Sequence, residues 1–179
     1  MKNTKNAALQ ILEKLESKLN SFLQYSDQLS LEQLIKRQSK EAWSVLEIIE
    51  HLKVAETASL RYLKYKKEKE TKFEKASIRN AINGWILVSF FKSPIKAKAP
   101  NVPGLNPIGK DLDYKTVKKE WQRSRQELRI FIHGLEEAEF KMAMYKHRIG
   151  KMTIGWMLAF FEVHMNRHFG QIDRILAEN

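Results

Sequence analysis

Three of the five histidines in this 179-residue chain are spaced so that their side chains can meet. His164 and His168 are four residues apart, which places them on one face of a helix with Cβ atoms about 5–6 Å apart. His51 lies far earlier in the chain. Neutral imidazole binds Zn, Ni, Cu and Fe, and three protein ligands leave positions at the metal for water or substrate. The set therefore indicates a catalytic metal site, and the alternative is three buried histidines satisfied by hydrogen bonds.

The helices expected around these histidines turn all three toward the interior. A capping box at Ser44–Glu47 begins a helix that continues to about Lys69, and His51 lies on the apolar side of that helix. The last helix is expected from about residue 153 onward, and its two histidines lie on the face that carries Phe161. Three imidazoles therefore converge from two helices onto one region of the core.

Apolar residues recur at helical spacing on both sides of one long loop, and no segment shows the alternation of a half-buried strand. Two further long helices are expected, over about Thr4–Tyr25 and Tyr114–His133. All four prolines fall in Pro94–Pro107, within the connection between the second and third long helices. We predict an all-α fold, a four-helix bundle with this long Pro-rich connection, that forms a single domain over residues 1–179.

The composition narrows the classes of function. The chain has no cysteine, which excludes disulfides, thiolate metal sites and a cysteine nucleophile, so any metal must be held by His, Asp or Glu. The net charge of +11 permits contact with nucleic acid, an anionic membrane or acidic ligands, but by itself it is evidence for none of them. No helix-turn-helix signature is present, and nucleic acid is not an expected partner. No apolar run approaches about 18 residues, and Met1–Ser21 lacks a signal-peptide core. We therefore expect a cytoplasmic protein without a membrane partner.

Four other residues bear on the candidate site. Glu47 lies one helical turn before the first of the three histidines and Gln171 lies three residues after the last, so each is a candidate to support a ligand or to handle a proton. For Glu47 the capping role is favoured. His147 is interpreted as a surface residue, with a place at the mouth of the site as the alternative. His133 is interpreted as a helix C-terminal residue that the helix dipole favours.

The apolar stretch Ala81–Phe91 (AINGWILVSFF) is expected to form a short helix. Core packing is the first interpretation of its aromatic residues Trp85, Phe90 and Phe91, and a substrate lid or a dimer surface are the alternatives. The stretch carries more apolar side chains than a short excursion on a monomer should expose. A homodimer that buries them is therefore expected.

Two sequence motifs resemble those of the DinB-like superfamily of metalloenzymes. One is WSVLEIIEHL at Trp43–Leu52, and the other is MTIGW at Met152–Trp156 followed by HMNRHFGQI at His164–Ile172. Members of that superfamily are four-helix bundles, usually dimers, that bind a divalent metal through one His of the second helix and an H-x-x-x-H pair of the last. The resemblance therefore implies that the three histidines named first are the metal ligands.

The resemblance also implies a class of function. We expect a divalent-metal-dependent enzyme with a small-molecule substrate, and Zn or Ni as its cofactor ahead of Fe or Mn. Characterised relatives include enzymes that use low-molecular-weight thiols, so a thiol-dependent S-transferase is expected ahead of a hydrolase. The alternative is a non-enzymatic ligand-binding or stress-response interaction protein. The chain departs from the family at about residues 81–110, where its connection is longer and more apolar.

Overall fold

The computed structural model describes residues 4–70, 72–95 and 111–178 of the chain. Helices make up most of these residues, which confirms the prediction of an all-α fold. Among the helices described, none is both long and apolar enough to cross a membrane.

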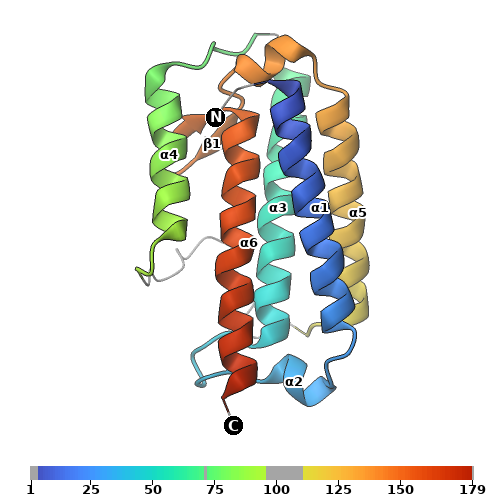
Figure 1. Ribbon diagram of the computed structural model, residues 1–179. Helices are drawn as coiled ribbons and strands as arrows, with labels where there is room; N and C mark the ends of the chain where they lie inside the picture. Colours follow the sequence, from blue (N-terminus) through green and yellow to red (C-terminus); the bar gives the residue numbers. More distant parts are fainter. Residues whose placement is uncertain (1–3, 71, 96–110, 179) are drawn as a thin grey trace.

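Within the described residues, four long helices lie side by side along one axis (Figure 1). They are α1 (Lys5–Ser26), α3 (Val45–Lys69), α5 (Tyr114–His133) and α6 (Ile154–Ala177). Figure 1 shows α1 and α6 running in one direction and α3 and α5 in the other. Each of α5 and α6 packs against both α1 and α3. The predicted four-helix bundle is therefore confirmed, and its helices begin and end close to the residues expected.

Side-chain caps begin α3 and α5 at the positions where the sequence predicts these helices to start. The hydroxyl of Ser44 accepts a hydrogen bond from the backbone N–H of Glu47 at 3.2 Å, and the Glu47 carboxylate accepts from the N–H of Ser44 at 2.7 Å. At the start of α5, Asp113 accepts from the N–H of Thr116 at 2.8 Å. Such caps satisfy backbone donors that have no partner inside the helix. The cap at Ser44 thereby fixes where His51 lies along α3.

The apolar sides of the long helices meet in one core. Trp121 of α5 and Phe161 of α6 are among its largest fully buried side chains. Removing these surfaces from water is the main favourable contribution to folding. Apolar residues at helical spacing in α1 form one buried stripe, and its members are Ala8, Leu12, Leu15, Leu19 and Phe22.

An ion pair lies inside the bundle between α3 and α5. One terminal nitrogen of Arg125 lies 2.6 Å from each carboxylate oxygen of Glu56, and the two side chains are 4% and 6% exposed. The indole N–H of Trp121 donates to the same carboxylate at 2.9 Å. The attraction and the added hydrogen bond offset part of the cost of taking two charges out of water, while Nη1 of Arg125 has no hydrogen-bond partner among the described residues. The pair therefore links α3 to α5, and removal of either partner would leave the other charge buried without its counter-ion.

Helix α4 (Ile78–Lys92) lies outside the four-helix bundle and packs against α6 and the strand β2 (Figure 1). It includes the short helix predicted at Ala81–Phe91. Because α3 and α5 run in the same direction, the chain between them must return along the bundle, and α4 provides part of that return. Trp85 is 62% exposed, so its interpretation as a core residue is wrong. Most of the predicted Pro-rich connection lies at 96–110, outside the described residues.

Three shorter elements complete the described fold. The helix α2 (Leu31–Ile35) lies at one end of the bundle, and the 3-10 helix η1 (Glu137–Lys141) lies at the other (Figure 1). Between η1 and α6, the strands β1 (Tyr145–His147) and β2 (Gly150–Met152) form an antiparallel hairpin. The sequence does not predict this hairpin, because strands of three residues are too short to show an alternating pattern.

Candidate functional site

The candidate site lies inside the bundle, where α3 packs against α6. His51 is in the second turn of α3, and its neighbours Ile48 and Leu52 are fully buried. His164 and His168 are one helical turn apart on α6. His51 and His164 are buried and His168 is half-buried, so the predicted inward direction of all three side chains is confirmed.

The three imidazoles meet at their Nε2 atoms. Nε2 of His164 lies 3.3 Å from Nε2 of His51 and 3.1 Å from Nε2 of His168. One ring nitrogen of each histidine lies within 4.8 Å of those of the other two. The bundle therefore brings together the three residues that the sequence analysis selected, and their nitrogen atoms are close enough to share one metal ion.

Gln171 sets the protonation of the His168 ring. Its side-chain Oε1 lies 3.0 Å from Nδ1 of His168. An amide oxygen can only accept a hydrogen bond, so Nδ1 carries the proton and, in the neutral ring, Nε2 carries the lone pair. That lone pair is directed toward His164. The sequence analysis expected this residue to support a ligand, and the contact it needs for that role is present.

Glu47, the other residue expected to support a ligand, makes different contacts. It forms the cap with Ser44, and its carboxylate pairs with the Arg37 guanidinium at 3.2 Å. These contacts agree with the capping role that the sequence analysis favoured. They also hold the carboxylate at the first turn of α3, on the Ser44 side of the site.

Aromatic rings enclose the histidine cluster. Phe160 stacks on the His164 ring with centroids 5.1 Å apart, and Phe91 of α4 meets the same ring edge-on at 5.2 Å. On the other side, the ring centroid of Trp43 lies 4.6 Å from that of His51. Such rings restrict the access of water and lower the local dielectric constant. The site therefore has histidine nitrogen at its centre and apolar surface around it.

Burial favours the neutral form of the imidazoles. It lowers the pKa of His164 well below the usual value, and the nearby rings of His168 and His51 lower that pKa further. Burial also lowers the pKa of His168 to about 3, with the His51 ring acting in the same direction and the hydrogen bond to Gln171 in the opposite one. Because only neutral imidazole binds a metal, both rings are in the binding form at neutral pH.

Two further polar residues border the cluster. His147 of β1 is half-buried, its ring lies 5.4 Å from that of Phe160, and burial lowers its pKa. Its interpretation as a surface residue is therefore wrong, and its place beside the site agrees with the alternative. Arg167 donates to the backbone carbonyls of Ser93 and Ile95, immediately after α4. These two hydrogen bonds hold the C-terminal end of α4 against α6.

The sequence analysis did not select Phe160 or Arg167. Phe160 lies four residues before His164, so helical spacing alone could have placed the two rings together. Arg167 gives no comparable signal, because its partners are backbone carbonyls whose position depends on how α4 packs. His133 is the last residue of α5, as predicted from the sequence.

Comparisons with known proteins agree with the helical fold and with the resemblance seen in the two motifs. A family model described as the DinB superfamily matches residues 14–172, a range that includes all three histidines. The chain is similar to the uncharacterized protein YuaE of Bacillus subtilis (strain 168), with 27% identity over 154 residues that cover 82% of this chain and 85% of YuaE. No solved structure matches the chain. The family match confirms the resemblance seen in the two motifs, and the chain belongs to the DinB superfamily.

Proposed function

We propose that this chain is a divalent-metal-dependent enzyme in which His51, His164 and His168 hold the metal. The observation that supports this most directly is the spacing of the Nε2 atoms, at 3.3 and 3.1 Å from the central His164. A tetrahedral zinc site with Zn–N bonds of about 2.0–2.1 Å places its nitrogen ligands about 3.3–3.4 Å apart. Two of the three separations are thus close to those of a tetrahedral ligand set, and all three nitrogen atoms lie within 4.8 Å of one another.

Hydrogen bonding alone satisfies the cluster poorly. Nε2 of His164 faces two other ring nitrogens, but a neutral imidazole nitrogen carries either one proton or one lone pair. It can therefore form one well-directed hydrogen bond and not two. A metal ion would accept a lone pair from each of the three rings at once.

Zinc or nickel is the metal we propose, ahead of iron or manganese. All three ligands are imidazoles, which suit zinc and nickel. Manganese prefers oxygen ligands, and non-haem iron sites of this size commonly combine two histidines with a carboxylate. Three protein ligands leave positions for water or substrate, as in catalytic zinc sites.

A metal held here would supply Lewis acidity toward a water molecule or a thiol. The side chains of the protein would orient the metal ligands and limit the access of water to the metal. Gln171 keeps the proton of His168 on Nδ1, and the rings of Trp43, Phe91 and Phe160 limit the access of bulk water. Because the chain has no cysteine, a sulfur nucleophile must arrive as a cosubstrate. We propose a thiol-dependent S-transferase ahead of a hydrolase, since the two motifs resemble those of thiol-using relatives.

Elemental analysis of protein purified without chelator tests the metal site. We expect about one equivalent of metal in the wild type and less than about a tenth of that in His164→Ala, because three ligands are needed to hold the ion. The matched control is His133→Ala, which removes an exposed histidine at the end of α5 and should leave the metal content unchanged. Equal metal content in wild type and His164→Ala would refute the site.

Turnover assays test the reaction. Metal-loaded protein is mixed with a panel of cellular thiols and a chloro-dinitro arene, so that a C–S bond forms as chloride leaves and the thiol proton passes to solvent. Ester and amide substrates test hydrolysis in parallel. We expect the wild type to exceed His168→Ala by at least about tenfold on the thiol panel. Equal rates on every substrate would reject the enzymatic proposal in favour of the alternative.

The alternative is a non-enzymatic DinB-like protein that binds a ligand or takes part in a stress response. The observation that favours it is the burial of His51 and His164, which are 8% and 7% exposed, so that only His168 approaches the surface. In that case His51→Ala lowers the free energy of unfolding, and no substrate shows metal-dependent turnover. The metal content and the turnover assay together separate the two proposals.

A further inference from the structure

Helix α4 is apolar on two opposite sides. Its inner side packs against the bundle, where Gly84 and Leu87 are buried. Its outer side carries four large apolar side chains at helical spacing, and we call these the outer stripe. They are Ile78, Ile82, Trp85 and Ile86, which are 82%, 49%, 62% and 42% exposed.

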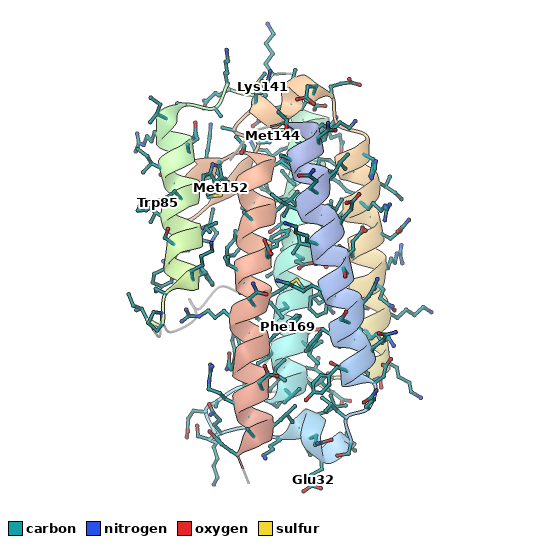
Figure 2. The ribbon with its side chains drawn as sticks, in the orientation of Figure 1. Glu32, Trp85, Lys141, Met144, Met152 and Phe169 are labelled. Carbon is teal, nitrogen blue, oxygen red and sulfur yellow. The ribbon has the colours of Figure 1, made fainter. Side chains whose placement is uncertain are left out.

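The packing of α4 prevents the helix from turning its outer stripe inward. A Cβ atom on Gly84 would lie only 2.3 Å from Cγ of Trp156, so the α4 backbone lies directly against this α6 side chain. The amides of Asn80 and Asn83 also donate to the backbone carbonyl of Lys151 in β2, at 3.1 and 3.2 Å. In Figure 2, Trp85 accordingly lies on the side of α4 that faces away from the bundle.

Exposed apolar side chains gather at α4 and are sparse elsewhere in the described residues. Ile95, just after α4, is 59% exposed, and Ile149, at the turn of the neighbouring hairpin, is 38% exposed. Together with the outer stripe they make up six of the eleven large exposed apolar residues in the described part of the chain. Single exposed apolar residues are common on soluble proteins, whereas a contiguous group marks an interaction surface.

The charge around the outer stripe is positive. From Lys75 to Ile95 the chain has no acidic residue, and α4 itself carries Arg79 and Lys92. The hairpin beside α4 adds Lys146 and Arg148, both exposed. A second copy of α4 packed on this stripe would bring cations together and offer no carboxylate to offset them. The surface is therefore complementary to a partner that is both apolar and anionic.

We propose that α4 docks this protein onto the surface of an anionic lipid bilayer. The outer stripe enters the boundary between headgroups and acyl chains, as apolar faces of interfacial helices do, and the flanking Arg79 and Lys92 pair with lipid phosphates. Such a helix lies along the membrane and needs no spanning length, so the lack of a spanning helix among the described ones is compatible with it. The proposal is independent of the metal site. It departs from two expectations of the sequence analysis, namely that the protein has no membrane partner and that a homodimer buries this stretch.

Vesicle sedimentation tests the docking directly. We expect the wild type to sediment with vesicles that contain phosphatidylglycerol and to stay in the supernatant with vesicles of phosphatidylcholine alone. Tryptophan fluorescence should also be quenched by acyl chains that are brominated close to the headgroups, because the Trp85 ring would lie at the boundary between headgroups and acyl chains. The chain has four tryptophans, so this quenching should be lost when Trp85 is replaced. Failure to bind phosphatidylglycerol vesicles at low ionic strength would overturn the proposal.

Matched variants assign the binding to the outer stripe. The double substitution Ile82→Ser with Trp85→Ser should lower the fraction bound at least about tenfold. The control Ile130→Ser removes an apolar side chain that is 64% exposed on α5 and should bind as the wild type does. Arg79→Gln with Lys92→Gln should weaken the binding and its dependence on salt. Circular dichroism of each variant checks that its helical content is that of the wild type.

Two outcomes would contradict the proposal even if vesicles bind. Undiminished binding of the Ile82→Ser, Trp85→Ser variant would mean that net charge alone attracts the protein. Light scattering could instead give a particle of twice 21.1 kDa that the same double substitution splits into monomers. The outer stripe would then be an interface between two copies of this chain and not a membrane surface.

Discussion

Nε2 of His51 and Nε2 of His164 lie 3.3 Å apart, although 113 residues separate the two histidines in the chain. They come from α3 and α6, which run in opposite directions and pack against each other (Figure 1). No local element joins them, so the candidate site exists only when the bundle is folded. Any change in the protonation or ligation of these rings therefore changes the stability of the protein.

The metal-free protein should lose stability as the pH falls below about 6.5. Folding lowers the pKa of His168 to about 3 and lowers that of His164 as well, whereas each has a value near 6.5 in the unfolded chain. In that window the unfolded chain binds more protons than the folded one, so the free energy of unfolding rises with pH. Urea denaturation from about pH 7 to about pH 4 measures this slope.

The contribution of His168 to that slope can be isolated with one variant. His168→Gln removes one of the titrating rings, so the free energy of unfolding should depend less steeply on pH. The same slope in the wild type and in His168→Gln would contradict the assignment.

Gln171→Ala should weaken metal binding about 10–100-fold, the usual cost of losing a residue that orients a ligand. Without the acceptor at 3.0 Å, the proton of His168 is free to move to Nε2 and to block the lone pair. Competition with a chromophoric chelator measures the affinity. The control Gln126→Ala removes an exposed glutamine of α5 and should have no effect. An unchanged affinity of Gln171→Ala would show that another contact orients the ring.

Gly84→Ala should destabilise the protein by about 1–3 kcal/mol, as overpacking commonly does. The new Cβ would lie 2.3 Å from Cγ of Trp156, so α4 or the indole must move. Gly170→Ala is the matched control in α6, because its Cβ would meet nothing closer than Arg174 at 3.7 Å. Alanine is also the better helix former, so Gly170→Ala should not destabilise the protein. Equal stability of the two variants, measured by thermal unfolding, would contradict the close contact.

Glu56→Ala should cost about 3–5 kcal/mol, because it leaves the buried Arg125 without its carboxylate partner. Glu127→Ala breaks an ion pair between the same two helices at the surface, where the side chains of Lys64 and Glu127 are 47% and 39% exposed. That substitution should cost less than about 1 kcal/mol. Urea denaturation of both variants provides the test, and similar losses would mean that burial of the Glu56 pair is unimportant.

The sequence by itself predicts which residues share a face of a helix. Spacing of three and four residues places His164 beside His168, and the same spacing identifies the buried stripe of α1. Caps are equally local, which explains why the start of α3 at Ser44 could be predicted from four residues. All of these features depend on geometry within one helix, and that geometry is the same in every protein.

The partners of each face were not predictable in this way. Phe91 reaches the His164 ring from α4, and Glu56 pairs with Arg125 across the interior of the bundle. Spacing within one helix carries no information about which helix lies opposite or how the two are rotated. These contacts depend on packing between residues far apart in the chain, so only the tertiary structure decides them.

The same distinction explains the two interpretations that the structure corrects. Trp85 and His147 each occur in a sequence context compatible with both core and surface, and the sequence analysis assigned Trp85 to the core and His147 to the surface. The tertiary structure reverses both, because the close packing of Gly84 on Trp156 directs Trp85 outward while the hairpin brings His147 beside Phe160. Whether a side chain on a short element is buried depends on what packs against that element, and this is decided only when the whole chain folds.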